Sequence, residues 1–378
     1  MLEGNWKPIR VKDLKISHTF YADDVLLFGE ARLNNLEGIM RVLNNFSNES
    51  GLQINSNKSR IIFSNKMHHR LRKIMAKSVY MIPPTSFGRY LGAPVSNLKA
   101  KPSDFDDILL RFKEKLCIWQ TKFLNLAGRA TLIKSMLTAL PIHLMQTTML
   151  PKKILTEMER GMRKFLWNKL DSANYLPRVP WDVVTKSKLE GGLGVKRLET
   201  WNKCFMAKLA WKIHTKEDSL WVKLMTKKYL SRQSFQEAEP KPYHFPNWKM
   251  ILKHKKWAID HSIIRIGSGK NISFWYEKWL SIGHLIKNEE TNCPRTYETV
   301  RVSTFHKNGH WREDILQKLV SPNILKEIKK IKIEPLSQDR EVWSLTKSGD
   351  FTVQSLYNKI ISPKAHTSCD KLINGISK

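Results

Sequence analysis

Apolar residues recur at helical spacing over much of the chain. From Leu33 to Phe46 they fall three or four positions apart, and Gly51 stands where a helix commonly ends. A short basic helix is predicted over residues 67–77. A longer helix is expected to begin at Ser103, a residue type that caps helices. The longer helical patterns cover residues 103–123, 126–140, 151–165, 198–213 and 220–229.

Strand-like patterns are shorter and fewer. Branched and aromatic residues flank a two-acid turn in residues 16–28, which predicts a β-hairpin. Short strands are also predicted at residues 52–54 and 60–63, and a second hairpin with a glycine-rich turn at residues 264–275. Residues 231–246 are polar and rich in proline, which is typical of a linker. Together these patterns predict an α+β fold that is mostly helical.

The turn of the first hairpin carries two adjacent acids, Asp23 and Asp24. Neighbouring side chains of a regular strand point to opposite faces, but this rule relaxes at a hairpin tip, so at least one carboxylate can project into a cleft. A carboxylate on a rigid hairpin is a suitable ligand for Mg²⁺, which binds few protein ligands and keeps water and phosphate in its other positions. The alternative is an exposed turn between two core strands.

Charge is the feature of the composition that changes this picture most. The 378 residues include Lys+Arg 65 against Asp+Glu 34, a net charge of +31. Such an excess predicts a polyanionic partner, and nucleic acid is the usual one. A hydrophobic content of 41% predicts a folded chain with a sizeable core. Some of the 13 tryptophans are expected in that core, and others could stack on bases.

Cysteine spacing and the lack of long apolar runs argue against several other classes. The four cysteines are far apart and form no Cys-x-x-Cys pair, which speaks against a zinc site and against a secreted disulfide framework. No apolar run predicts a membrane-spanning helix, and the N-terminal residues lack the apolar core of a secretory signal. A nuclear or cytoplasmic location without a membrane partner is therefore expected.

Several motifs follow one another along the chain, and their order is far more specific than any one of them alone. Tyr21-Ala-Asp-Asp24 is followed by Gly51-Leu-Gln-Ile-Asn-Ser-Asn-Lys-Ser59 and then by Tyr90-Leu-Gly92. This order resembles the palm of a reverse transcriptase, and specifically that of LINE-type (non-LTR) retrotransposons of plants. Phe165-Leu-Trp167 resembles part of the thumb of that family, and the stretch from Trp181 to Gly194, with its Gly-Gly-Leu-Gly, resembles its connector. The stretch from Gly349 to Tyr357 resembles the segment that leads into the zinc-binding module of the family.

The resemblance implies a site for polymerase chemistry in the palm. Asp23 and Asp24 match the metal-binding acids of the family, and Mg²⁺ is the implied cofactor. Lys58 matches the lysine beside the incoming triphosphate, where an ammonium can stabilise the leaving pyrophosphate; the alternative is a solvated turn lysine. Tyr90 lies in a segment that resembles the primer grip, and its ring either packs against the nucleic-acid backbone or belongs to the core.

The resemblance also implies a helical thumb that grips the backbone of nucleic acid. Such a surface binds phosphates with Lys and Arg and does not read sequence. A solvated charged face is the alternative for any single cation. The expected binding residues are Arg111, Lys113, Lys115, Lys122 and Arg129.

The expected organisation has four parts. They are a partial palm at residues 1–98, a helical thumb and connector at 99–230, a linker at 231–263 and a tryptophan-rich post-thumb region at 264–378. By the layout of the family, an upstream metal-binding aspartate, the fingers and a zinc-binding module are absent. The chain is therefore expected to be a fragment of an RNA-directed DNA polymerase that is inactive alone. Its implied partners are an RNA template, a DNA primer and a chain that completes the site. The alternative is a non-catalytic basic nucleic-acid-binding protein derived from such an element.

Overall fold

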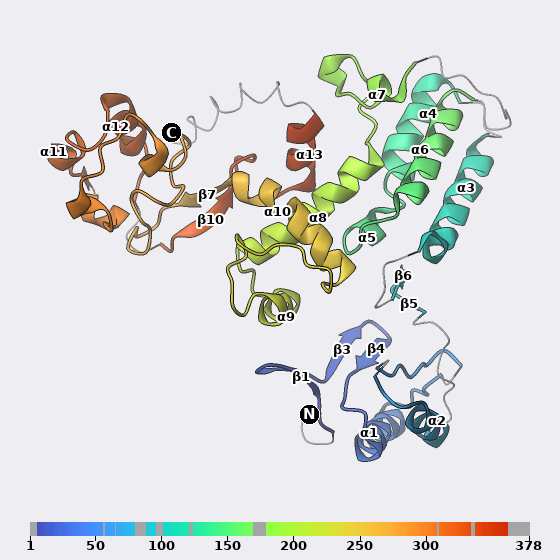
Figure 1. Cartoon of the computed structure of the whole chain (residues 1–378). Coiled ribbons are helices and arrows are strands. Elements are labelled where there is room, and N and C mark those ends of the chain that lie inside the picture. Colours follow the sequence, from blue (N-terminus) through green and yellow to red (C-terminus); the bar gives the residue numbers. More distant parts are fainter. Residues whose placement is uncertain are drawn as a thin grey trace. The chain divides into compact units, whose positions relative to one another are not determined.

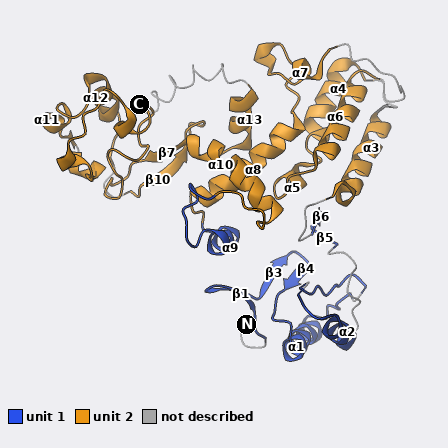
Figure 2. Cartoon of the chain, in the orientation of Figure 1, with its two compact units in different colours: residues 1–100, 218–238 blue, residues 101–217, 239–378 orange. Residues whose placement is uncertain are grey.

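The chain divides into two compact units (Figure 2). Residues 1–100 and 218–238 form unit 1, and residues 101–217 and 239–378 form unit 2. The fold is α+β and mostly helical, which confirms the predicted class. Among the described residues, no helix has the length and hydropathy that a membrane crossing needs. The computed structural model describes residues 6–55, 57–64, 66–79, 88–95, 101–120, 124–168, 179–307, 310–333 and 337–361.

Unit 1 combines short antiparallel strand pairs with helices (Figure 1). Each strand pairs with its neighbour in the chain. The elements are β1 (Ile9–Val11), β2 (Leu14–Ile16), β3 (His18–Tyr21), β4 (Asp24–Leu27), α1 (Leu33–Ser50), α2 (His69–Ser78), β5 (Arg89–Tyr90), β6 (Ala93–Pro94) and α9 (Leu220–Tyr229). Helix α9 packs on β1 and β2, where the Lys227 ammonium forms an ion pair with Asp13.

Helix α1 follows from its amphipathic pattern. Gly51 ends it with a φ of 72°, a left-handed conformation that glycine adopts without steric cost. The apolar face of α1 contributes Leu36 to a small buried cluster with Met75 and Val79. The buried cluster between α1 and α2 is therefore small.

Unit 2 is a larger assembly of helices with a mixed C-terminal part. Helix α8 packs against α10, and also against α5, α6 and α13. The elements are α3 (Asp106–Gln120), α4 (Leu126–Leu132), α5 (Ile142–Met145), α6 (Lys152–Leu166), α7 (Trp181–Val184), α8 (Leu198–His214), α10 (Pro246–Asp260), β7 (Ser262–Arg265), β8 (His306–Lys307), β9 (His310–Trp311), α11 (Glu313–Leu316), α12 (Pro322–Lys329), β10 (Arg340–Trp343) and α13 (Val353–Ile361).

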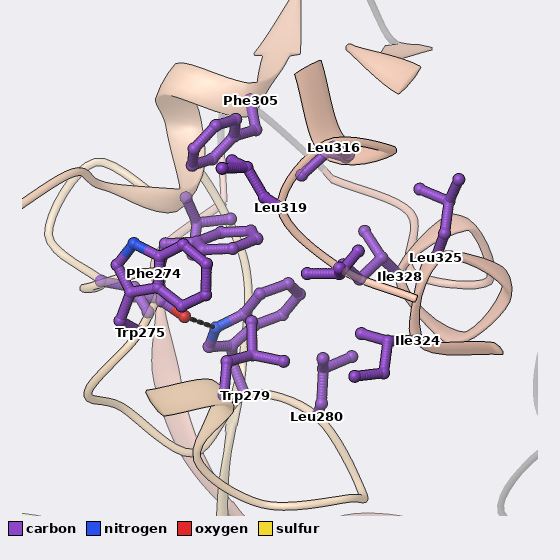
Figure 3. Close-up of a cluster of buried hydrophobic side chains, with 14 of the residues drawn as sticks. Phe274, Trp275, Trp279, Leu280, Phe305, Leu316, Leu319, Ile324, Leu325 and Ile328 are labelled. Carbon is purple, nitrogen blue, oxygen red and sulfur yellow. Dashed lines mark hydrogen bonds between the residues drawn. The ribbon is translucent and has the colours of Figure 1, made fainter. Parts of the chain in front are cut away.

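The C-terminal part of unit 2 has a core rich in aromatic rings (Figure 3). Phe274 and Phe305 are fully buried with ring centroids 4.4 Å apart. The indole N–H of Trp279 donates to the Phe274 carbonyl oxygen at 2.9 Å, so the ring is buried without losing its hydrogen bond. Trp275 lies in the same cluster. These rings confirm the expectation that part of the tryptophan content is core.

Several predicted strands do not form. Residues 52–54 and 60–63 contain no strand. Residues 264–275 form no hairpin, because β7 pairs instead with β10, much further along the chain. A strand needs a neighbour for its backbone N–H and C=O groups, and an alternating pattern does not say which segment supplies it.

Three helical boundaries also differ from the predictions. Ser103 does not cap a helix: a 3₁₀ turn at Pro102–Phe105 precedes α3, and there the Lys101 N–H donates to Asp104 Oδ2 at 2.7 Å. The predicted helix at 126–140 is interrupted, since α4 passes into a π-helical turn at Ile133–Leu137. Helix α10 occupies much of the range 231–263 that was expected as a linker.

Candidate nucleic-acid interface

The β3–β4 hairpin places the two acids at its tip. Its register pairs Tyr21 with Asp24, which leaves Ala22 and Asp23 as the two turn residues. Ala22 has a φ of 50°, a conformation that favours glycine in such turns. For an L-residue it costs about 1–2 kcal/mol. Strain of this kind is concentrated at functional sites, so the turn is a candidate for one.

The surroundings of this turn are open. Asp23 and Asp24 are exposed, and the rings of Phe20 and Tyr21 are 56% and 61% exposed. Among the described residues this sheet has two strands, so β3 and β4 each have one edge that no described strand pairs with. Aromatic rings this exposed beside a free sheet edge indicate a surface suited to contact with another segment or molecule.

The donor set for a metal ion is incomplete in the described residues. Asp23 and Asp24 supply two carboxylates, the ligand type that Mg²⁺ prefers. Within the described ranges, no group of three or more His, Cys, Asp or Glu side chains is arranged to hold a metal ion. The hairpin therefore fits Mg²⁺ only in part, and a further carboxylate would have to join it.

Lys58 lies in a turn that follows α1. Its backbone N–H donates to the side-chain and the backbone carbonyl oxygens of Asn55, each at 3.1 Å, which fixes the turn. The Lys58 side chain is exposed, and in the part of the chain that is described no hydrogen bond or ion pair links it to Asp23 or Asp24. Its place beside a triphosphate stays a prediction.

Tyr90 lies on a tight hairpin of its own. The register of β5 and β6 pairs Tyr90 with Ala93. The turn residues Leu91 and Gly92 both have positive φ, at 49° and 76°, as the two-residue turns between twisted strands require. The Tyr90 ring is half-buried. It is therefore held by a rigid turn and still presents a face to solvent, so both predicted roles stay open.

Helix α3 presents cations on one side and apolar residues on the other. Phe112 and Leu116 are buried, whereas Arg111, Lys113 and Lys115 are exposed. The Lys113 ammonium pairs with Glu157 of α6 at 2.7 Å, which neutralises part of its charge. Arg111 and Lys115 form no ion pair with another described residue, and their i,i+4 spacing puts them on one face. That face suits contact with phosphates.

The other two cations expected to bind nucleic acid, Lys122 and Arg129, are not exposed cations of α3. Lys122 lies outside the described residues. Arg129 lies in α4, half-buried, and its Nε has no hydrogen-bond partner among the described atoms. An unsatisfied guanidinium N–H is costly unless another group supplies an acceptor. Arg129 is thus less a free surface cation than Arg111 and Lys115, and its contact with nucleic acid stays a prediction.

The structure also brings together residues that sequence reasoning missed. The Lys196 ammonium lies 4.7 Å from the ring centroid of Trp201 and 4.5 Å from that of Tyr357, and it donates to Gln354 Oε1 at 2.5 Å. Burial lowers the pKa of Lys196 to about 8. Trp201 lies close in the chain and could have been suspected, but Tyr357 is too distant for any local pattern to find.

Glu159 of α6 lies at the same junction. Its Oε1 accepts the backbone N–H of Leu198 at 2.7 Å and so caps the start of α8. Burial raises the pKa of the Glu159 carboxyl, although this hydrogen bond acts in the opposite direction. Asp182 of α7 forms an ion pair with Arg197 nearby. The junction thus ties α6, α7 and α13 to the start of α8.

Comparison with known proteins gives two relatives from Arabidopsis thaliana. No protein-family model matches the chain. A protein named "Putative ribonuclease H protein" is 28% identical over 273 residues, which are 71% of this chain and 44% of that protein. An uncharacterized mitochondrial protein is 26% identical over 144 residues, which are 38% of this chain and 93% of that protein. The chain thus spans less than half the length of the first relative, and over most of its own length it is similar to a plant protein named for ribonuclease H.

Proposed function

We propose that the chain is part of an RNA-directed DNA polymerase of a plant LINE-type retroelement. The observation that carries this proposal is the β3–β4 hairpin, which presents Asp23 and Asp24 on a strained two-residue turn. The net charge of +31 and the free cations of α3 support binding to nucleic acid. A plant relative named for a nuclease that acts on nucleic acid is consistent with the same class of partner.

In this proposal each part of the chain has one task. Asp23 and Asp24 contribute two of the carboxylates that hold Mg²⁺, and a further carboxylate comes from outside the described residues. When bound, Mg²⁺ would stabilise the charge that develops on the transferred phosphoryl group. Arg111 and Lys115 bind the phosphates of the template–primer duplex without reading its sequence. Polymerization would then need a chain that completes the metal site.

Duplex binding and primer extension test this proposal together. Purified protein is expected to bind a poly(rA)/oligo(dT) duplex, with an affinity that falls steeply with salt because phosphate contacts release counterions. The double variant Arg111→Gln/Lys115→Gln should lower the salt slope by about two. The protein alone should not extend the primer with Mg²⁺. Binding that is absent or insensitive to salt would contradict the proposal.

Metal-directed cleavage tests the hairpin separately. Fe²⁺ replaces Mg²⁺ at carboxylate sites and, with ascorbate and peroxide, generates radicals that cut the nearby backbone. With duplex bound, cleavage is expected close to residues 20–27 and should be lost in Asp23→Asn/Asp24→Asn. The matched control, Glu37→Gln/Glu49→Gln, removes two exposed acids of α1 and should leave cleavage unchanged. Equal cleavage in the Asp23/Asp24 variant would show that the hairpin does not bind the metal.

A further inference from the structure

A tight turn directly before α10 carries a tyrosine at its tip. Residues 241–244 form this turn, and two hydrogen bonds join its ends. The His244 N–H donates to the Lys241 carbonyl oxygen at 3.1 Å, and the Lys241 N–H donates to His244 Nδ1 at 3.1 Å. Pro242 occupies the second position, where its ring fixes φ near the value that common turns need. Tyr243 is therefore held in place by a rigid backbone.

His244 anchors the turn in unit 2, while Tyr243 points away from the core. His244 is buried, whereas Tyr243 is 78% exposed. Burial, and then the ammonium groups of Lys241 and Lys249, lower the pKa of His244, so its Nδ1 stays available as an acceptor at neutral pH. The two rings meet edge to face with centroids 4.9 Å apart. The anchor thus fixes the tyrosine without burying it.

Tyr243 is the most exposed aromatic residue in the part of the chain that the structure describes. Exposed aromatic residues are not rare, so exposure alone does not identify a site. The groups around the ring are more informative. They decide which kind of molecule can approach it.

Lysines surround the ring of Tyr243. The Lys241 ammonium lies 6.0 Å from the ring centroid, and the Lys249 ammonium donates to the Pro242 carbonyl oxygen in the same turn. Four and seven positions after Lys249 come Lys253 and Lys256, which are exposed, so the three lysines share one side of α10. We call these three residues the lysine face of α10. It extends the positive charge from the turn along the helix.

Few acids oppose these cations. Residues 239–260 hold five lysines against two acids, Glu239 and Asp260, an excess of three positive charges with both carboxylates counted in full. Glu239 pairs with a lysine of α10 at 3.0 Å, and Asp260 lies at the end of α10 that is farther from the turn. On α8, which packs against α10, Glu199 pairs with a lysine of the same helix, as does Glu217 just beyond it. The surroundings of the turn therefore favour a polyanion.

We propose that the turn and the lysine face of α10 bind single-stranded nucleic acid, with a base stacked on Tyr243 and phosphates bound by the lysines. An exposed ring among cations is typical of proteins that bind single strands without reading their sequence. In a duplex the neighbouring pairs cover the face of each base, so only an unpaired base can stack on the ring. An acidic peptide would match the lysines but offers the tyrosine no base. The inference rests on the proposed nucleic-acid binding and goes beyond it, since α3 is assigned to a duplex.

Binding to oligo(dU) and to a blunt duplex separates this site from α3. Tyr243→Ala is expected to weaken oligo(dU) binding about tenfold, because a stacking contact is lost, and to leave the salt slope and duplex binding unchanged. Tyr243→Phe keeps the ring and should bind like the unchanged protein. Lys253→Gln should lower the salt slope for oligo(dU) by about 0.7.

Tyr276→Ala serves as the matched control. Tyr276 is another exposed tyrosine of unit 2, but its hydroxyl donates to Glu298 at 2.8 Å, so an acid stands beside the ring in place of the lysines. This variant should bind oligo(dU) like the unchanged protein. A loss as large as that of Tyr243→Ala would contradict a site at the turn.

Photocrosslinking gives a readout that needs no variant. In oligo(dU) that contains 5-iodouracil, irradiation links the base to an aromatic ring stacked on it, and peptide mapping of the full chain is expected to find the link at Tyr243. The same experiment with oligo(rU) tests RNA, and a link with one sugar alone would identify that strand as the ligand.

Three results would overturn the inference. They are no link at Tyr243 with either strand, unchanged affinity of Tyr243→Ala for both oligonucleotides, and competition by polyglutamate as strong as that by unlabelled oligo(dU). If Arg111→Gln/Lys115→Gln still lowers the salt slope for the duplex in that case, the proposed function stands and only this contact is lost.

Discussion

Lys196 shows how a single side chain can be held in an environment that opposes its charge. The faces of Trp201 and Tyr357 attract the ammonium, but its burial lowers the pKa to about 8. The Tyr357 hydroxyl accepts the backbone N–H of Arg197 at 2.7 Å, and burial raises the pKa of Tyr357 to about 12. Both side chains therefore stay in their ordinary protonation states at neutral pH, at some cost for the lysine.

This cost predicts how stability depends on pH. The folded pKa of Lys196, about 8, lies below its unfolded value of 10.5, so the unfolded chain binds more protons between these values. The penalty is fully present below about pH 8 and is relieved as the pH rises towards 10.5. The free energy of unfolding of the unchanged protein should therefore rise relative to that of Lys196→Met over this window. Urea unfolding of both proteins from pH 7 to 10 checks it, and parallel curves would contradict it.

The candidate residues differ in how far sequence could find them. Asp23 and Asp24 could be placed at a hairpin tip from sequence, because adjacent residues determine a hairpin turn. The structure contains the predicted hairpin. The pairing of Lys196 with Tyr357 joins segments far apart in the chain. No spacing rule reaches such pairs, since they depend on how the helices pack.

Helices were predicted more reliably than strands, for a physical reason. The hydrogen bonds of a helix are internal, so the periodic pattern in residues 33–50 was sufficient to predict α1. A strand depends on a second segment. Residues 52–54 alternate like a strand but pair with no other described segment, while β7 pairs with β10 across many intervening residues. A π-helical turn also interrupts the helix after α4, although the apolar pattern of residues 126–140 is continuous.

The packing of α3 on α6 depends on Gly161. A Cβ at this position would lie 2.9 Å from Leu116 Cδ1 and 3.0 Å from Phe112 Cε1. Alanine would gain about 1 kcal/mol of helix propensity. Overpacking between buried side chains costs about 1–3 kcal/mol, so Gly161→Ala should destabilise unit 2 by up to about 2 kcal/mol.

Urea unfolding checks this prediction, and Gly128→Ala provides its control. In α4 a Cβ at Gly128 would meet its nearest atoms, in Asn125 and Leu124, at 3.4 Å, which is ordinary contact. Gly128→Ala should therefore leave stability unchanged or raise it slightly. A Gly161→Ala protein as stable as the Gly128→Ala protein would show that the two helices can move apart without loss.

The two units differ in how much core they possess. Leu36, Met75 and Val79 form the buried cluster between α1 and α2 in unit 1, which also exposes Phe46 and Leu52. Helix α8 of unit 2 alone buries nine residues. Since apolar burial is the main favourable term in folding, unit 1 should open at a lower free energy than unit 2.

Hydrogen exchange measures this difference directly. Amides of α1 are expected to exchange faster than those of α8 by the factor that their opening free energies set, about tenfold for each 1.4 kcal/mol. Bound duplex with Mg²⁺ should slow exchange in the β3–β4 hairpin if the hairpin holds the metal. Equal protection of α1 and α8 in the free protein would contradict the prediction that unit 1 opens at a lower free energy than unit 2.

At the scale of the whole molecule, the sequence predicted the fold class but not that a later segment of the chain returns to unit 1. Residues 218–238 belong to unit 1, although residues 101–217 that precede them belong to unit 2. Helix α9 was expected in the thumb and connector, and instead it packs on β1 and β2 with Lys227 paired to Asp13. An ion pair between positions this far apart in the chain cannot be predicted from the local sequence around either residue.

This return has a consequence for synthesis on the ribosome. At about 5–20 residues per second, translation of residues 101–217 takes roughly 6 to 23 s. During that time the nascent β1–β2 hairpin lacks its packing partner α9, while the helices of unit 2 emerge and begin to fold. Unit 1 is thus begun before unit 2 but completed late, and during the delay it is the more open of the two units to chaperones, proteases or a complementing strand.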